Sequence, residues 1–262
     1  MIDIHTHILP RIDDGPLSWD ESIQILRAGQ EEGIREVVVT PHVLGNLDRE
    51  LEREIQDKFG ELKRRASSEG IGLRFHLGSE IYIQPEINLN SPISTFDGKG
   101  RYLLIEFPLG RIPEYADDLL FKLVLDGYTP ILAHPERNLV ILRNPGKLYS
   151  LIQMGVLIQV NSGSLSGEFG SSVRELALEM MDNNWVHFVA SDCHDPEQRP
   201  MRLKEAWGIV EKNWGKDRAR LLFLRNPRKA IRGEKIIPPE PLPFERKRRK
   251  IIELLKRLRP GG

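Results

Sequence analysis

The chain has 262 residues, enough for one large α/β domain, and 40% of them are hydrophobic, as is usual for a globular protein with a sizeable core. It carries 38 basic and 38 acidic side chains, but eight basic and only two acidic residues fall within 244–262. The remainder is acidic, with 30 basic and 36 acidic residues, which argues against a broad nucleic-acid-binding surface.

The sequence contains no apolar run that approaches the ~20 residues of a membrane span. The opening MIDIHTH lacks the basic and apolar regions of a signal peptide, so we expect none. The single cysteine, Cys193, excludes an internal disulfide. These features lead us to expect a cytoplasmic protein.

Short runs rich in Val, Ile and Leu alternate with longer amphipathic stretches, which predicts βα units and a mainly parallel sheet. Strands are predicted at 1–5, 36–40, 74–78, 102–106, 129–133, 157–161 and 186–191. Helices are predicted at 18–32, 49–68, 115–126, 145–154, 171–183 and 200–213. Ser18 and Glu21 form a capping-box pattern at the first helix. The proline- and glycine-containing segment 84–100 is predicted to be a loop with at most short helical turns.

The C-terminal part differs in composition from the rest. We divide the chain into a barrel domain at 1–235 and an extension at 236–262, where four prolines mark a linker. Beyond the linker, 244–258 predicts a basic amphipathic helix with Ile251, Leu255 and Leu258 on one face. Such a helix is suited to contact an anionic membrane surface or a partner subunit.

Side chains that can bind metals fall where predicted strands end. Five of the seven histidines and three acids lie there, namely His5, His7, His42, His134, His194, Glu80, Glu106 and Asp192. In a parallel α/β barrel the C-terminal strand ends form one active face. Imidazole and carboxylate together suit Zn, Mn or Fe, and paired metals suit hydrolysis of phosphate esters.

Other readings of single residues remain open. One His-x-His or one acid at a strand end also occurs in structural roles, so the joint pattern carries the prediction. His76 and His187 lie inside predicted strands, and we interpret both as structural. Cys193 lacks a catalytic-cysteine signature, so we do not expect it to be the nucleophile.

Several motifs resemble one family in order along residues 1–233. They are DIHTHILP (3–10), DDGP (13–16), TPH (40–42), GSEI (78–81), LIEFP (104–108), AHPER (133–137), QVNSGSLSG (159–167) and SDCH (191–194). Together they resemble the bacterial protein-tyrosine phosphatases of the polymerase-and-histidinol-phosphatase (PHP) superfamily, found in capsule and exopolysaccharide operons. The resemblance implies an α/β fold, a distorted (β/α)7 TIM-like barrel.

The resemblance also implies a centre of three divalent ions, usually Mn²⁺, with Zn²⁺ or Fe as alternatives. His5, His7, Glu80 and Asp192 would hold one ion, and Glu80 would bridge to a second held with Glu106 and His134. Asp14, His42 and His194 would hold the third. Arg137 and Arg199 match positions in the substrate site, where arginine is suited to bind phosphate oxygens in bidentate fashion.

The expected function is hydrolysis of protein phosphotyrosine by metal-activated water. The family's partner is the C-terminal tail of a bacterial tyrosine autokinase that controls polysaccharide export. The sequence departs from the family at Arg11, where glycine is usual, and at Asn138, where an aromatic residue is common. Both positions bear on substrate preference.

Three alternatives stay open at this point. Two are enzymes of related chemistry: a small-metabolite phosphatase of the histidinol-phosphate type, and a PHP phosphodiesterase or exonuclease. The third is a non-enzymatic scaffold whose basic tail binds membrane or nucleic acid, and the completeness of the ligand set argues against it.

Overall fold

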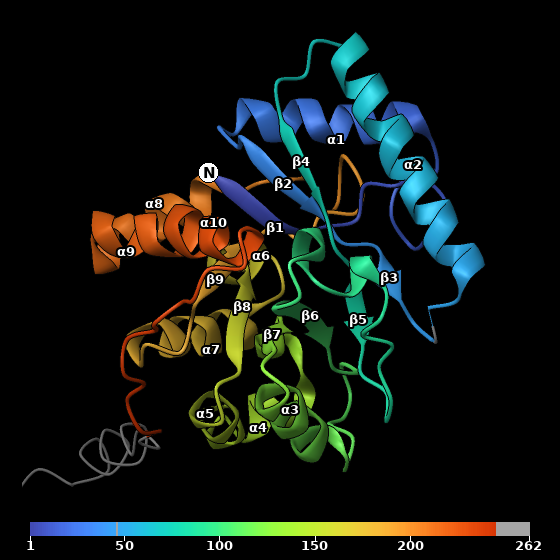
Figure 1. Ribbon diagram of the computed structural model, residues 1–262. Helices are drawn as coiled ribbons and strands as arrows, with labels where there is room; N and C mark the ends of the chain where they lie inside the picture. Colours follow the sequence, from blue (N-terminus) through green and yellow to red (C-terminus); the bar gives the residue numbers. More distant parts are fainter. Residues whose placement is uncertain (46, 245–262) are drawn as a thin grey trace, which may run out of the picture.

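All strands pair in parallel in this computed structural model, which describes residues 1–45 and 47–244 (Figure 1). One sheet has the order β1-β2-β4 and the other β3-β5-β6-β7-β8-β9. The strands are β1 (Ile2–Thr6), β2 (Glu36–Val39), β3 (His42–Val43), β4 (Arg74–Leu77), β5 (Glu80–Tyr82), β6 (Tyr102–Glu106), β7 (Thr129–Ala133), β8 (Leu157–Asn161) and β9 (Phe188–Ala190).

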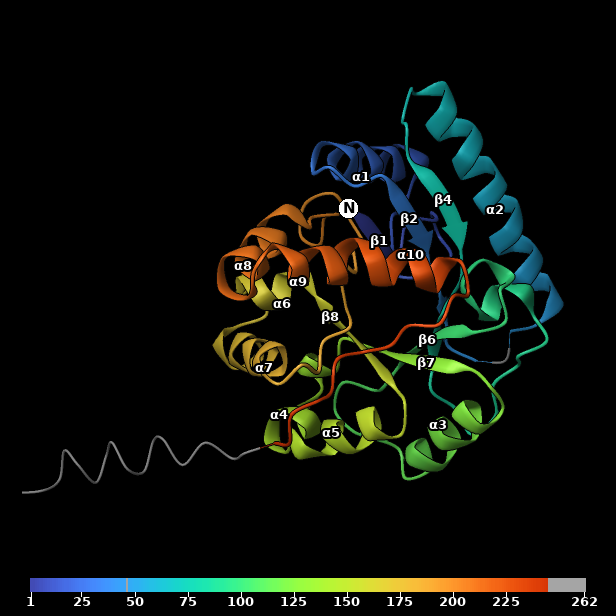
Figure 2. The ribbon, with the colours of Figure 1, turned by 60° about the vertical axis from the view of Figure 1, so that its left-hand side comes forward.

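Helices surround the two sheets (Figures 1 and 2). They are α1 (Trp19–Glu31), α2 (Arg49–Ser68), α3 (Ala116–Leu125), α4 (Leu139–Arg143), α5 (Gly146–Gln153), α6 (Ser162–Ser166), α7 (Ser171–Asp182), α8 (Lys204–Trp214), α9 (Lys216–Arg220) and α10 (Asn226–Ile231). Short turns are η1 (Pro92–Ser94), η2 (Phe96–Gly98), η3 (Pro135–Arg137) and the π-helical η4 (Leu221–Arg225). Across the described ranges, no helix has the length and apolar character needed to traverse a membrane.

The two sheets meet at two seams. The first seam crosses two neighbouring chain segments: residues 40–41 separate β2 from β3, and residues 78–79 separate β4 from β5. Pro41 has no N–H to donate, which interrupts regular pairing at the first seam. The second seam lies between β1 and the residues that follow β9, where an isolated parallel bridge joins Thr6 to Cys193. The described residues therefore form two parallel sheets and no closed barrel, whereas the sequence led us to expect one distorted (β/α)7 barrel.

Period-two alternation along the strands places polar side chains at one end of the second sheet. Tyr102 and Leu104 of β6 are buried in an inner apolar cluster, and Glu106 ends the strand. Strand β8 repeats this pattern, with Leu157 in the same cluster and Asn161 at its end. Residues two apart share a face, so the strand starts build an apolar core and the strand ends build a polar centre.

Each strand and helix predicted between residues 1 and 213 has a counterpart in the structure. The Ser18 side chain caps α1 as predicted, by accepting a hydrogen bond from the backbone N–H of Glu21. The Glu21 carboxylate accepts from the N–H of Leu17 in place of Ser18, so only one half of the capping box forms. The predicted loop at 84–100 contains only the turns η1 and η2. The strands β3 and β5 and the helices α4, α6, α9 and α10 were not predicted. Each is two to six residues long, too short for a period to show.

Residues 234–244, which we call the C-terminal strap, run from α10 toward α5 (Figure 2). The Tyr102 hydroxyl donates to the Glu234 carbonyl at 2.7 Å, and the Leu242 N–H donates to the Asn183 carbonyl at 2.9 Å. The indole N–H of Trp185 donates to the Leu242 carbonyl at 2.9 Å. The first part of the predicted extension thus packs on the body. Apart from Phe244, the predicted amphipathic helix lies outside the described residues.

Candidate metal centre

The centre is built around two histidines at the end of β1. The Nε2 atoms of His5 and His7 lie 3.0 Å apart, and Oε2 of Glu80, at the start of β5, lies 3.1 Å from each. Asp192, which follows β9, places Oδ1 3.3 Å from His5 Nε2 and 3.6 Å from His7 Nε2. All four side chains are buried, so their charges are poorly solvated and must be balanced within the site.

A hydrogen-bond chain fixes the ring of His5. Asp192 Oδ2 accepts from the Asn161 amide at 2.7 Å, and Asn161 Oδ1 accepts from the Gln159 amide at 2.8 Å. This orientation turns Gln159 Oε1 toward His5 Nδ1, at 2.9 Å. Because that oxygen can only accept, His5 carries a proton on Nδ1 and presents Nε2 to the centre.

Asp13 fixes the ring of His7 in the same way. Its Oδ2 lies 2.8 Å from His7 Nδ1 and also accepts from the backbone N–H of His42 at 2.9 Å. The Nε2 atoms of His5 and His7 therefore face each other with one lone pair each. Two such lone pairs repel at this distance unless a proton or a cation lies between them. Burial disfavours a charged His7, yet Asp13 and Glu80 raise its pKa well above the ordinary value, so the site attracts a cation.

A second group of ligand-type atoms surrounds Glu80 from the other side. His134 Nε2 lies 3.1 Å from Glu80 Oε1 and 3.7 Å from Oε1 of Glu106. His42 Nδ1 lies 3.0 Å from Glu80 Oε2 and 3.9 Å from Oε2 of Glu106. Glu80 touches histidines on both sides, as a carboxylate that bridges two ions would.

The third group lies toward solvent. Asp14 Oδ1 lies 3.2 Å from His194 Nε2 and 3.4 Å from His42 Nε2. The Nδ1 atom of His194 lies 3.0 Å from the backbone carbonyl of Asp192 and donates to it, which leaves the Nε2 lone pair facing Asp14. Asp14 is 63% exposed, so a substrate can reach the centre from this side.

Buried carboxylates crowd the centre. Burial opposes ionisation of Glu80, but His5, His134 and His7 hold its pKa well below the usual range. Burial and the nearby charge of Glu80 raise the pKa of Glu106 to about 7. Burial likewise opposes ionisation of Asp192, and the charges of His5 and neighbouring groups hold its pKa low. The residues fit divalent cations, because histidine nitrogens and carboxylate oxygens converge on a buried centre and a cation there would balance the negative charge of the carboxylates.

Both predicted substrate-site arginines contact Asp192. Arg137 Nη1 lies 3.0 Å and Arg199 Nη2 lies 2.6 Å from its Oδ2. The Arg137 guanidinium also lies over the Phe169 ring, 4.4 Å from the centroid. The two side chains are 18% and 28% exposed, so each borders the centre and solvent at once.

The structure brings all nine predicted ligand residues into one connected centre. Its grouping differs from the expected partition in three respects. His134 lies near Glu80 and Glu106 but belongs to none of the compact groups. His7 also lies with Asp14, His42 and His194, and His42 also lies with Glu80 and Glu106. The spacing of residues along the sequence does not predict which side chains belong to two groups at once.

Three supporting residues were missed by the sequence analysis, namely Asp13, Gln159 and Asn161. The sequence did carry a signal for Gln159, because this polar amide stands between apolar residues in the middle of a predicted strand. In the structure it is fully buried in β8. Asp13 stood beside Asp14 in the DDGP motif, and the sequence could not tell which of the two faces a histidine ring from behind.

His76 and His187, which we interpreted as structural, belong to none of the ligand groups of the centre, and Cys193 stands between two proposed ligands without facing substrate. His187 is buried, and its Nδ1 accepts from the Ile158 N–H at 2.9 Å. His76 lies 3.4 Å from Asp97. Cys193 is fully buried, and burial raises the pKa of its thiol well above the usual value, which disfavours a thiolate nucleophile.

Known proteins are similar to this chain in sequence and in fold. Residues 1–232 match the family described as "Capsular polysaccharide synthesis, CpsB/CapC". The chain belongs to the CpsB/CapC family. Tyrosine-protein phosphatase YwqE of Bacillus subtilis is 38% identical over 258 residues, covering 96% of this chain and 99% of YwqE. Tyrosine-protein phosphatase CpsB of Streptococcus pneumoniae is 32% identical over 243 residues, covering 90% of this chain and all of CpsB.

The CpsB/CapC fold is also known from crystals. A structure from work on YwqE of Bacillus subtilis and CpsB of Streptococcus pneumoniae, described as metal-dependent tyrosine phosphatases, matches with a TM-score of 0.88 and 36% identity. The match covers 94% of this chain and 100% of that chain. A phosphotriesterase homology protein from Escherichia coli matches with a TM-score of 0.55 at 12% identity, which extends the likeness in fold alone.

Proposed function

We propose that this chain is a metal-dependent protein-tyrosine phosphatase. The observation that carries the proposal is the convergence of nine histidine and carboxylate side chains at one centre, in a chain similar over almost its whole length to metal-dependent tyrosine phosphatases. These relatives favour phosphotyrosine over the small-metabolite and phosphodiester alternatives.

The metal ligands in this proposal are His5, His7, Asp14, His42, Glu80, Glu106, His134, Asp192 and His194. These side chains would hold three divalent ions, with Mn²⁺ as the first candidate. Such ions would activate water for attack on phosphorus and neutralise charge on the phosphoryl oxygens. Asp13 and Gln159 hold His7 and His5 in the orientation that this role requires.

Arg137 and Arg199 would bind the non-bridging oxygens of the phosphate monoester. Their guanidinium groups meet at Asp192 Oδ2, so they already lie beside the centre with their charges directed to one point. A monoester dianion gains more from two such charges than a diester, which has one fewer charged oxygen.

The physiological substrate we propose is the phosphorylated C-terminal tail of a tyrosine autokinase that controls polysaccharide export, which would place the enzyme in the cytoplasm. The family's description in terms of capsular polysaccharide synthesis supports this assignment. We further propose that the two parallel sheets are the halves of a distorted (β/α)7 barrel, split where Pro41 interrupts pairing.

A substrate panel tests this function. Full-length protein in one manganese-containing buffer is assayed with para-nitrophenyl phosphate, a phosphotyrosine peptide, histidinol phosphate and a bis-aryl phosphodiester. We expect the two aryl monoesters to have the highest kcat/KM. If the phosphotyrosine peptide is the poorest monoester, the assignment to phosphotyrosine fails. If the diester is hydrolysed fastest, the monoesterase proposal fails as well.

A further inference from the structure

A pocket lies at the opposite end of the strands from the metal centre. It has a volume of about 310 Å³ and is lined by the first residues of three strands, Tyr102 of β6, Thr129 of β7 and Leu157 of β8. Glu106, a residue of the metal centre, stands at the other end of β6, which is roughly 13 Å away at the rise of a strand. The pocket is therefore separate from the phosphatase site.

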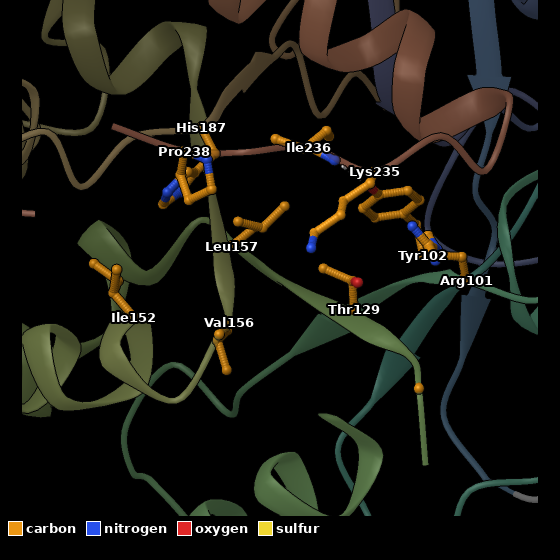
Figure 3. Close-up of a pocket in the computed structure, with 12 residues that line it drawn as sticks. Arg101, Tyr102, Thr129, Ile152, Val156, Leu157, His187, Lys235, Ile236 and Pro238 are labelled. Carbon is orange, nitrogen blue, oxygen red and sulfur yellow. Dashed lines mark hydrogen bonds between the residues drawn. The ribbon is translucent and has the colours of Figure 1, made fainter. Parts of the chain in front are cut away.

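The wall of this pocket carries positive charge without matching acids. Arg101 comes from the body and Lys235 from the C-terminal strap, and no carboxylate side chain lines the pocket. Within the described ranges neither cation lies within ion-pair distance of a carboxylate. Figure 3 shows Lys235 extending from the strap into the space above Thr129. Two cations that share a pocket and lack acidic partners favour an anionic ligand.

His187 adds a donor to the same wall. Its Nδ1 accepts from the Ile158 N–H, so the neutral ring must carry its proton on Nε2. Burial keeps the ring neutral, and Nε2 has no hydrogen-bond partner although it is buried. A buried N–H without an acceptor is rare and costs stability. This N–H is a separate polar feature of the wall, and the two cations are what favours an anionic ligand.

The remaining wall is apolar. Ile152, Val156, Leu157, Ile236 and Pro238 line it beside the polar groups. We propose that this pocket binds a small organic oxyanion, whose charged group lies between Arg101, Lys235 and Thr129 and whose apolar body packs on these side chains. The volume is at the lower end of the range for small-molecule sites. A ligand here would also join the strap to the strand starts, because Lys235 and Ile236 belong to the strap.

Naphthalene-1-sulfonate is a suitable probe, because it has both parts and no hydrolysable ester. Its binding to the metal-loaded full-length protein is measured by isothermal titration calorimetry, with neutral naphthalene-1-methanol as the uncharged comparison. The test variant is R101Q/K235Q, and K212Q/K216Q is the matched control, which removes two exposed charges elsewhere. Thr129→Val, nearly isosteric, removes one polar group with little risk to folding.

We expect the sulfonate Kd to rise ~10-fold or more in R101Q/K235Q and several-fold in Thr129→Val, and to stay unchanged in K212Q/K216Q. Hydrolysis of para-nitrophenyl phosphate should be unchanged in all three variants. The proposal is overturned if the sulfonate does not bind, or if it binds no better than the neutral alcohol. Equal affinity in wild type and both pocket variants would overturn it too. If R101Q/K235Q fails to fold, Thr129→Val decides.

Discussion

Asp13 and Gln159 act from behind the proposed ligands, where each fixes the proton on a histidine ring. Partners of this kind orient the ring and raise its basicity, and their loss typically weakens metal binding ~10- to 100-fold. We therefore expect Asp13→Asn to need ~10- to 100-fold more Mn²⁺ for half-maximal hydrolysis of para-nitrophenyl phosphate. Asp20→Asn, on the exposed face of α1, is the control and should match wild type. An unchanged Mn²⁺ midpoint in Asp13→Asn would contradict this role.

Arg137 and Arg199 both contact Asp192, so each could act by binding the substrate phosphate or by positioning Asp192. Activity and metal content together distinguish these two roles. Arg137→Ala and Arg199→Ala should each lower kcat/KM by ~10- to 1000-fold, as expected when a charge-assisted contact in the transition state is lost. Metal content should stay at the wild-type level, since Asn161 still donates to Asp192. Arg143→Ala, at an exposed position in α4, is the control. Loss of metal in parallel with activity would mean that the arginines act by positioning Asp192.

Cys193 is the residue that a cysteine-based mechanism would need. Its thiol is buried, and its raised pKa keeps it protonated at neutral pH. We expect Cys193→Ala to retain most of the activity towards para-nitrophenyl phosphate. A loss of ~100-fold or more with intact metal content would instead support a cysteinyl intermediate.

At the scale of elements, the junction of β8 and β9 contains a histidine whose charge state is linked to folding. Burial lowers the pKa of His187 to about 3 in the folded protein, whereas an exposed histidine has a pKa of ~6.5. Unfolding therefore takes up a proton below that pH, and His187 makes the free energy of unfolding fall as pH drops from ~6.5 toward 3.

His187→Gln should remove this dependence, which amounts to at most ~1.4 kcal/mol per pH unit. Urea unfolding of metal-free wild type and variant at pH 7 and pH 5 measures the difference. The variant should lose less stability than wild type between the two values, and His76→Gln serves as the control. If wild type and His187→Gln lose the same free energy of unfolding between pH 7 and pH 5, protonation of His187 does not cause the loss.

The elements that sequence patterns predicted are the long ones. Strands such as β6 and helices such as α2 are long enough for a hydrophobic period to appear, and their bounds agree with the prediction. Strands β3 and β5 were missed because each is defined by pairing with a distant segment, as in the register of His42 with Glu80. Local propensity has no access to that information.

Across the whole molecule, the sequence predicted which side chains meet but not how they are shared. Parallel strands bring their C-terminal ends together, so eight of the nine proposed ligands could be identified as one set. The ninth, Asp14, was expected only from the family resemblance. The split into two sheets could not be predicted, because it depends on how the chain bends at residues 40–41 and 78–79. Nor could the role of Asp13, which depends on ring orientations that only the folded chain defines.

Metal removal and restoration, with a phosphotyrosine peptide as substrate, test the central claim most directly. Full-length protein is stripped with a chelator, assayed, then reloaded with Mn²⁺ and assayed again, with metal content determined by elemental analysis at each step. The account predicts about two to three divalent ions in the loaded protein, because nine ligands exceed what one ion needs. Activity should be lost on stripping and regained on reloading. A fully active protein without bound metal would contradict it.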